Sequence, residues 1–501
     1  MVIPVRRSQE SPARRPSYRG VMTQTTDVRT ERAAEAKQRL RDILGQEQVR
    51  DGDSERDLHG ADFSFHEPHR PDFVVYPGTT QDVSSVLAIA HELAVPVTAF
   101  GAGTSLEGHV IPVCGGISLD LTRLDKILEV SPQNMTATVQ AGVTRLALDG
   151  AAGKHGLTFP VDPGADATLG GMAATNAAGT TTVRYGKMRA NVLALEAVLA
   201  DGTIIRTGSR SAKTSAGYDL TGLLVGSEGT LAVITELTLR LYPVPDYAVA
   251  MRMTLPDVER ACQMAIRVMG AGVTAIRVEL IDAWMVSAIN AFSDTPYPEQ
   301  SSLFVELAGS EPTVVEDLEI VKALATDAGA LDIAVESRTE DRSRLWKARH
   351  DATHAAAAKM PGRKERTTDV CVPLTELAGT IHYAHTEIDR LGLHAGIVGH
   401  AGDANVHVAV FVDPNDADEM ARSDEFIHNV VDDALARGGT CTGEHGIGQG
   451  KRDALQQEHA DTIPLMSAIK DSFDPKHILN PGKVLPNSDG RAVRRSAMDV
   501  A

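Results

Sequence analysis

The sequence predicts an α+β fold in which glycine-rich loops join short strands. Residues 73–242 alternate short apolar runs with turns and helical stretches, and a charged region with fewer glycines follows at about 247–395. Strands that alternate with helices are typical of α/β or α+β domains. The 501 residues, of which 43% are hydrophobic and 23% charged, are enough for two or three globular domains.

The composition argues against several classes of protein. The net charge of -18 opposes binding to nucleic acid, because a phosphate backbone needs Lys and Arg to neutralise it. No run approaches the roughly 20 apolar residues that cross a bilayer. The four cysteines form no C-x-x-C pair, so the common cysteine-based zinc and thioredoxin-like signatures are absent. A reducing, cytoplasmic compartment is expected.

The N-terminus is predicted to be an extension. The first 21 residues lack the apolar run of a secretory signal and carry a single acidic residue beside Arg6, Arg7, Arg14, Arg15 and Arg19. We expect residues 1–30 to be disordered, with translation starting at Met22 rather than Met1. An Arg-rich transit peptide for organellar import is the alternative interpretation.

The expected elements follow in chain order. A polar, amphipathic helix is expected at about Glu31–Leu44. Apolar runs predict a series of strands, with a helix over 80–94 after the first of them: FVVYP, PVTAF, GISLDL, ATVQAG, AVAMRMTL and SLFVELAG. The composition shifts near Pro243–Pro245, which is the expected domain boundary. A last helix near 463–473 leads to DPKHILNPGK.

Three glycine-rich segments lie next to apolar strands: FGAGTSLEG at 100–108, PVDPGADATLGGMAATNAAGTTTVRYG at 160–186 and GSEGTLAVIT at 226–235. Small residues let backbone N–H groups converge on an anion such as a pyrophosphate. Leu106 stands where the Rossmann fingerprint needs a glycine, and the Walker pattern is absent. One such segment alone is more often a tight turn, but three in one region predict a nucleotide cofactor.

In their order along the chain and in their residue sequences, these segments resemble those of a family, the flavin-dependent D-2-hydroxyacid dehydrogenases. The family includes glycolate oxidase catalytic subunits, cytochrome-type D-lactate dehydrogenases and D-2-hydroxyglutarate dehydrogenases, and it has the flavin fold of vanillyl-alcohol oxidase. The resemblance spans roughly 70–486 and is carried by PVDPGADATLGGMAAT, YDLTGLLVGSEGTLAVIT, GTCTGEHGIG and LNPGK. The cytochrome-type D-lactate dehydrogenases are the most similar branch.

The resemblance implies how the chain is divided and where FAD binds. It implies a two-part FAD-binding domain over 31–246, an α+β substrate-cap domain with an antiparallel sheet over 247–445, a helical segment over 446–486 that returns to the flavin domain, and a polar tail over 487–501. The residues implied to line FAD are Gly101, Gly103, Thr104, Ser105, Pro163, Gly164, Gly171, Asn176, Glu228, Gly229, Ile234 and Asn480. Covalent members of the family have His where this chain has Thr104, so the implied FAD is non-covalent.

Two further stretches place histidines and a glutamate among glycines: VGHAGDANVH at 398–407 and TGEHGIG at 442–448. Two imidazoles and a carboxylate suit a divalent ion such as zinc, manganese or iron. The H-x6-H spacing is a weak signal by itself, and hydrogen-bonded histidines in turns are the alternative. The resemblance implies that His400, His407 and Glu444 bind the metal, zinc or manganese.

The catalytic base and the substrate partners are also implied by the resemblance. His445 follows Glu444 directly, and an imidazole pKa near 6.5 suits proton abstraction; the alternative is that His445 only orients Glu444. Arg349 and Thr353 share a helix face and Lys364 follows in a loop. In the family, the positions that match Arg349 and Lys364 hold the substrate carboxylate, and Thr353 matches the hydroxyglutarate branch.

These features predict FAD-dependent oxidation of a small D-2-hydroxy acid, with D-lactate first, to the 2-oxo acid. The metal would assist proton abstraction by His445 while flavin N5 accepts a hydride. Ala409 stands where the hydroxyglutarate branch has Asn, so D-2-hydroxyglutarate and glycolate stay open as substrates. A metal-dependent hydrolase and a non-catalytic flavin-binding subunit are the alternative classes. The electron acceptor (cytochrome, quinone, electron-transfer flavoprotein or oxygen), a homodimer and a peripheral membrane location also stay open.

Overall fold

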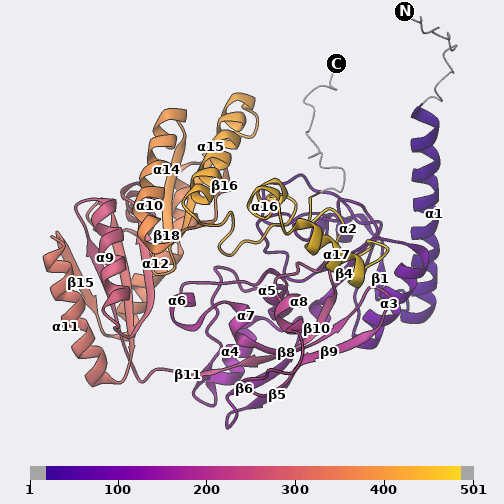
Figure 1. The fold of residues 1–501 in the computed structure, drawn as a ribbon, viewed down its shortest axis with the longest axis horizontal. Helices are drawn as coiled ribbons and strands as arrows, with labels where there is room; N and C mark the ends of the chain where they lie inside the picture. Colours follow the sequence, from indigo (N-terminus) through magenta and orange to yellow (C-terminus); the bar gives the residue numbers. More distant parts are fainter. Residues whose placement is uncertain (1–17, 487–501) are drawn as a thin grey trace, which may run out of the picture.

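The computed structural model describes residues 18–486, which form an N-terminal part, a cap and a C-terminal segment. In Figure 1 the N-terminal part (indigo to magenta) lies beside the cap (salmon to orange), and the C-terminal segment (yellow) covers the N-terminal part. Within residues 18–486, no helix combines the length and the apolar character needed to span a bilayer.

The N-terminal part begins with a four-stranded sheet of order β1-β2-β4-β3. Its strands are β1 (Val49–Arg50), β2 (Phe73–Val75), β3 (Val97–Phe100) and β4 (Ile117–Asp120), and its helices are α1 (Tyr18–Leu44), α2 (Asp53–Leu58), α3 (Thr80–Leu93) and the short 3-10 helix η1 (Leu121–Arg123). Strands β2, β3 and β4 run parallel. Leu40 of α1 and Leu87 of α3 share its hydrophobic core, which explains the continuous apolar runs of these strands.

A five-stranded antiparallel sheet of order β5-β6-β10-β8-β9 completes the N-terminal part. Its strands are β5 (Ile127–Ser131), β6 (Thr136–Gln140), β8 (Val192–Val198), β9 (Ile204–Gly208) and β10 (Val233–Arg240), and β7 (Leu157–Thr158) pairs separately with β11 (Tyr242–Pro243). The connecting helices are α4 (Arg145–Gly153), α5 (Leu169–Thr175), α6 (Thr182–Tyr185), α7 (Met188–Asn191) and α8 (Leu220–Leu224).

The cap is built on an eight-stranded sheet of order β15-β12-β14-β13-β18-β19-β16, with β17 paired to β19. Every pair is antiparallel, so the predicted antiparallel sheet is confirmed. The strands are β12 (Tyr247–Thr254), β13 (Ala275–Ile281), β14 (Ser302–Gly309), β15 (Asp332–Glu336), β16 (Lys364–Thr367), β17 (Val370–Cys371), β18 (His394–His400) and β19 (Asn405–Val412).

Helices cover both faces of the cap sheet. They are α9 (Val258–Gly270), α10 (Ala283–Ser293), α11 (Glu311–Asp327), α12 (Thr339–His350), α13 (Ala352–Lys359), α14 (Leu377–Leu391) and α15 (Ala417–Ala436), with the 3-10 helix η2 (Leu374–Glu376) before α14. Val408 of β19 packs in the core of α9, α11, α14 and α15, whereas its neighbours Ala409 and Phe411 pack with α10, α12 and α13. Alternate side chains of β19 therefore face opposite layers, and His407 falls on the side of Ala409.

The C-terminal segment returns to the N-terminal part, as predicted. It contains α16 (Arg452–Glu458) and α17 (Ile463–Phe473). After α17 the chain runs beside β3, where Val97 N–H donates to Ile478 O at 2.7 Å and Asn480 N–H donates to Val97 O at 2.8 Å. The buried ammonium of Lys470 adds a hydrogen bond of 2.6 Å to Thr230 O. These contacts place Asn480 next to the glycine-rich loops.

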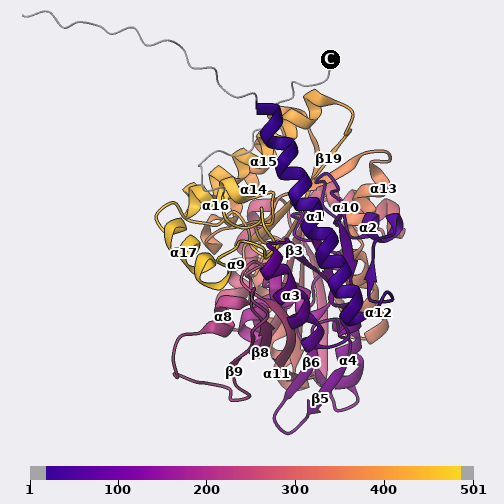
Figure 2. The same cartoon turned by 90° about the vertical axis from the view of Figure 1, so that its right-hand side faces the viewer.

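The predicted strands and the helices over 80–94 and 463–473 are confirmed, but the N-terminal helix is longer than expected. Figure 2 shows α1 as one long helix that runs beside α3 and extends past the rest of the N-terminal part. Helix α1 begins at Tyr18, upstream of the expected start at Glu31, and the predicted disorder of residues 1–30 stays a prediction. No proline follows Pro16 before Leu44, and a formed helix extends upstream at the cost of one residue per hydrogen bond. Residues 1–17 lie outside the described residues.

Candidate active site

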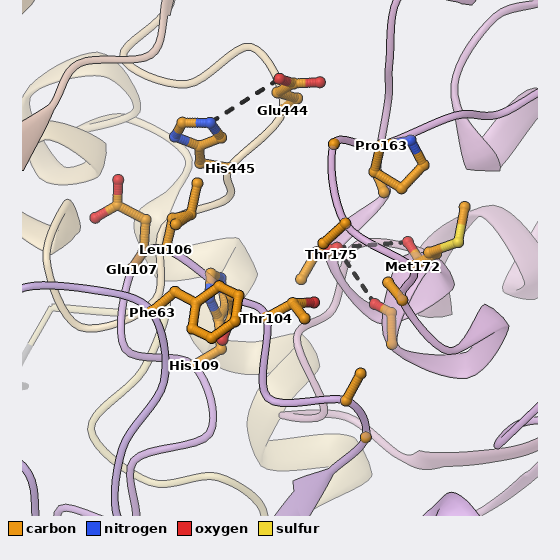
Figure 3. A pocket seen from close by; sticks show the side chains of 18 of the residues that line it. Phe63, Thr104, Leu106, Glu107, His109, Pro163, Met172, Thr175, Glu444 and His445 are labelled. Carbon is orange, nitrogen blue, oxygen red and sulfur yellow. Dashed lines mark hydrogen bonds and ion pairs between the residues drawn. The ribbon is translucent and has the colours of Figure 1, made fainter. Parts of the chain in front are cut away.

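A cavity of about 820 Å³ lies between the N-terminal part and the cap. In Figure 3 the loop that carries Thr104 and His109 forms one wall and Pro163 with α5 forms another, while Glu444 and His445 stand at its end. This volume is in the range of cavities that enclose a cofactor or a small ligand.

The glycine-rich loops form a cradle along this cavity. Eleven of the twelve residues predicted to line the cofactor are among the lining residues: Gly101, Gly103, Thr104, Ser105, Pro163, Gly164, Gly171, Glu228, Gly229, Ile234 and Asn480. A Cβ atom on Gly101 would overlap Thr168 Oγ1, whereas a Cβ on Gly164 would meet no atom within 4 Å. Gly101 is therefore required by the close approach of Thr168, whereas the missing side chain of Gly164 leaves room for a ligand to approach the backbone.

Asn480 carries a buried acceptor that is ready for a ligand. Its amide NH₂ donates to Glu228 O at 2.8 Å and to His109 O at 3.1 Å. Its Oδ1 is buried and has no hydrogen-bond partner within residues 18–486, and a buried polar atom of this kind is costly unless a ligand or water satisfies it. The cradle and this orphaned acceptor fit a flavin dinucleotide.

Glu228 lines the cavity but uses its carboxylate to hold the C-terminal loop. It accepts hydrogen bonds from Ile447 N–H at 2.7 Å and Gly448 N–H at 2.8 Å. The buried imidazole of His109 lies 3.1 Å away. Glu228 therefore joins the loop of Glu444 and His445 to the cofactor cradle.

Asn176 is not among the residues that line the cavity, and its role as a cofactor residue stays a prediction. It is the C-cap of α5 in the left-handed conformation, with φ of 53°. Its Oδ1 accepts a hydrogen bond of 2.9 Å from Arg189 N–H. Asn tolerates this conformation better than most residues, and the position of Asn176 is explained by the helix end.

Three predicted metal ligands converge at the cap end of the cavity. The β18–β19 hairpin pairs His400 with Asn405 and Val398 with His407, which places both imidazoles near the end of the hairpin. The Nε2 atoms of His400 and His407 lie 3.4 Å and 3.2 Å from Glu444 Oε1. One potential ligand atom from each of the three residues lies within 4.8 Å of the others.

The opposite ring nitrogens of both histidines are held by the protein. His400 Nδ1 lies 2.8 Å from Glu279 Oε1, and His407 Nδ1 lies 3.3 Å from Thr368 O. Metal-binding histidines usually donate their second N–H to a carboxylate or a carbonyl, which orients the ring. Two oriented imidazoles and a carboxylate are a suitable donor set for zinc or manganese.

Asp369 organises this group and was not predicted. Its Oδ2 accepts hydrogen bonds from Thr442 Oγ1, Glu444 N–H and His445 N–H at 2.7, 3.0 and 2.8 Å. Burial alone would raise the pKa of Asp369, but the nearby His445 and Lys451 hold this pKa below its ordinary value. Asp369 therefore fixes the backbone that presents Glu444 and His445 to the cavity.

A second set of potential ligand atoms overlaps the first: Asp369, His407 and His445 also offer three atoms within 4.8 Å of one another. The oxygens of Asp369 already accept those three hydrogen bonds and a fourth, from Asn405 Nδ2 at 2.9 Å. A carboxylate saturated in this way is a poorer metal ligand than Glu444, so the first set is favoured.

His445 has the surroundings of a base. Its ring stacks on His407 with centroids 5.0 Å apart, and its Nε2 lies 3.9 Å from Glu444 Oε1. Its Nδ1 is buried and has no hydrogen-bond partner within residues 18–486. Burial lowers the pKa of His445 to about 4, so the imidazole is neutral at pH 7 and has a nitrogen that can accept a proton.

Arg349 and Thr353 line the same end of the cavity. The buried guanidinium of Arg349 donates to Glu279 Oε2 at 2.6 Å, and its Nε has no hydrogen-bond partner within residues 18–486. Glu279 is fully buried and lies between Arg349 and His400. Glu279 was not predicted, because no motif surrounds it.

Lys364 is not among the residues that line the cavity, and its role as a substrate residue stays a prediction. It lies in strand β16 rather than in a loop, and its side chain is exposed. Thr367 of the same strand pairs with Ala409, and both line the cavity. Lys364 pairs with Val412, one residue beyond the lining residues Glu365, Arg366 and Thr367.

Comparisons with known proteins agree with this description. A family described as FAD binding domain matches residues 71–208, and one described as FAD linked oxidases, C-terminal domain, matches residues 244–484. The crystal structure of p-cresol methylhydroxylase with substrate bound superposes with a TM-score of 0.78 at 18% identity, covering 92% of this chain and 98% of that one. This likeness shows the predicted vanillyl-alcohol-oxidase type of fold.

Curated relatives cover most of the chain. A probable mitochondrial D-lactate dehydrogenase of Danio rerio is 44% identical over 450 residues, which are 89% of this chain and 90% of the relative. The mitochondrial D-lactate dehydrogenase [cytochrome] of Arabidopsis thaliana is 39% identical over 89% of this chain and 79% of its own length. The glycolate oxidase subunit GlcD of Bacillus subtilis is 34% identical over 90% of this chain and 96% of its own length.

Together, the fold and the site define an FAD-dependent oxidoreductase. Within that class, the chain belongs to the FAD-linked D-2-hydroxyacid dehydrogenases, the family of the D-lactate dehydrogenases and glycolate oxidase subunits. The family resemblance seen in the sequence is therefore confirmed, and FAD is its cofactor. Two of these relatives are named as mitochondrial, and a cytoplasmic location for this chain stays a prediction.

Proposed function

We propose that the protein oxidises D-lactate, or a similarly small D-2-hydroxy acid, to the 2-oxo acid, with FAD and a divalent metal, zinc or manganese. The observation that carries this proposal is the convergence of His400, His407 and Glu444 beside the unpartnered Nδ1 of His445. This group lines the same cavity as the glycine cradle. The named D-lactate dehydrogenases that match most of the chain support the choice of D-lactate.

Each group has a distinct task in this reaction. FAD in the glycine cradle supplies the hydride acceptor. A cation held by His400, His407 and Glu444 supplies a Lewis acid that lowers the pKa of the substrate hydroxyl. His445 accepts the hydroxyl proton at Nδ1, because burial keeps its imidazole neutral.

The substrate carboxylate is assigned to Arg349 and Thr353. The Nε–H group of Arg349 has no hydrogen-bond acceptor within residues 18–486. A guanidinium binds carboxylates with directional hydrogen bonds. Holding the carboxylate at this end fixes which hydrogen on C2 faces the cofactor. For the electron acceptor we propose a cytochrome, in line with the name of the relative from Arabidopsis thaliana.

Reduction of the bound flavin tests the proposed function directly. The purified protein is mixed anaerobically with D-lactate, L-lactate, glycolate or D-2-hydroxyglutarate, and bleaching of the flavin absorbance is followed by stopped flow. D-lactate should bleach the flavin fastest. If no 2-hydroxy acid bleaches it, the proposed reaction is wrong, and a higher kcat/KM for D-2-hydroxyglutarate would reverse the choice of substrate.

FAD should be released completely when the protein is precipitated with acid. Thr104 stands where covalent relatives have His, the cavity lining contains no Cys or Tyr, and His109 is held 3.1 Å from Glu228. No His, Cys or Tyr side chain of the glycine-rich segment around Thr104 is therefore free to form a covalent bond to the flavin ring. The supernatant should carry all of the yellow colour, and colour that stays in the pellet would contradict a non-covalent cofactor.

Arg349→Lys should lower kcat/KM for D-lactate about ten- to a hundred-fold. Lysine keeps the charge but loses the planar donor set, and a hydrogen bond to a charged group is worth about 1.5–3 kcal/mol. Steady-state kinetics and metal analysis on the same preparation separate substrate binding from the support that Arg349 gives to Glu279. An unchanged kcat/KM would remove Arg349 from the substrate site.

A further inference from the structure

The cap places an acidic side chain on the wall of the cavity, close to the proposed metal ligands. Strand β16 pairs with β19 so that Glu365 lies opposite Phe411 and Thr367 lies opposite Ala409. Glu365, Thr367, Ala409 and His407 all line the cavity. Because side chains alternate along a strand, Glu365 and Thr367 lie on one face of β16, next to the face of β19 that carries His407 and Ala409.

The carboxyl group of Glu365 is not neutralised by the protein. No residue among 18–486 gives it a hydrogen bond or an ion pair. Burial raises the pKa of Glu365 to about 7. The group is therefore ionised at moderately alkaline pH and still lacks a partner.

The arginines of the cavity wall are already occupied, and the imidazoles of His350 and His354 also line the cavity. Among residues 18–486, the lining contains no lysine, and its two arginines are Arg349 and Arg366. Arg349 is paired with Glu279 at 2.6 Å. Arg366 is paired with Asp424 at 2.6 Å and lies 4.3 Å from the ring centre of Phe65. The remaining neighbours at this end include Met285, Val398 and Ala409.

We infer that Glu365 is a specificity-determining residue, which keeps a second carboxylate out of the site. This inference rests on the proposed function and names its substrate class: a 2-hydroxy acid whose side chain carries no negative charge. A second carboxylate near Glu365 would meet a like charge and apolar side chains, and no arginine or lysine of the described wall is free to pair with it. Juxtaposed like charges disfavour binding, and rejecting the wrong ligand in this way is a common source of specificity.

The test compares D-lactate with D-2-hydroxyglutarate in Glu365→Gln. The substitution keeps the shape of the side chain and removes its charge. At about pH 8.5 the ratio of kcat/KM for D-2-hydroxyglutarate to that for D-lactate should rise about ten-fold, or about 1.4 kcal/mol. Glu340→Gln makes the same change of charge at an exposed position of α12, and it should leave the ratio unchanged.

Glu365→Ala is the second variant, and the flavin absorbance of each preparation reports whether it is folded. An unchanged ratio in both Glu365 variants, with normal bleaching by D-lactate, would overturn this inference and leave the proposed function intact. Failure of D-lactate to bleach the flavin of the unsubstituted protein would instead overturn the proposed function and the inference that rests on it.

Discussion

His445→Gln should slow reduction of the bound flavin by D-lactate about 10²–10⁴-fold, the usual cost of losing a general base. FAD and metal contents should stay close to those of the unsubstituted protein, because the proposed ligands are His400, His407 and Glu444. Glutamine keeps a side chain of similar reach but cannot accept the hydroxyl proton at neutral pH. Anaerobic bleaching measured by stopped flow isolates this step from any electron acceptor.

Raising the pH should partly restore the rate of His445→Gln, since hydroxide can replace the missing base. His428→Gln is a matched control, because His428 is 71% exposed on α15 and should have no effect. Two outcomes would contradict the assignment. Loss of metal from His445→Gln would make His445 a ligand or its support, and an unchanged rate of bleaching would mean that another group takes the proton.

Much of the fold followed from the sequence because its strands are buried. The runs FVVYP, PVTAF and GISLDL became β2, β3 and β4, and short apolar runs between turn residues are reliable signals of buried strands. Helix α1 was the exception. Its first residues are as polar as a disordered segment, so composition predicted disorder where the structure continues a helix.

The candidate site was predictable only where residues stand in motifs. The two glycine-rich histidine stretches brought His400, His407, Glu444 and His445 together as expected. Asp369 and Glu279 were missed because their partners are distant in the chain: Asp369 binds His445 N–H across 76 positions and Glu279 meets His400 across 121. No spacing rule reaches that far.

Lys364 and Glu365 show a different limit. The stretch GRKERTTD has no alternation of apolar and polar residues, so the sequence did not show that it forms a strand or which side faces the cavity. A one-residue change of register exchanges the two faces. The pairing of β16 with β19 decides that Glu365 rather than Lys364 lines the cavity.

His400→Ala and His407→Ala, made as separate variants, should cause the largest loss of metal. Each variant should lose activity along with its metal. Each substitution removes one proposed ligand and leaves the others with too few donors. Changing a residue that only supports a ligand typically costs 10- to 100-fold in metal affinity, so loss of a ligand itself should cost at least about 100-fold. Metal per chain, measured by mass spectrometry after dialysis, and flavin bleaching by D-lactate should fall in proportion.

The comparison between these two variants decides which group holds the metal. His407 belongs to both sets of potential ligand atoms, whereas His400 belongs only to the set with Glu444. If the set with Glu444 is correct, both variants lose the metal. If His400→Ala keeps its metal while His407→Ala loses it, Asp369 and His445 are the ligands. In that case His445 cannot be the base. A neutral imidazole has one nitrogen with a free lone pair, and the metal would occupy it while the other nitrogen carries a hydrogen.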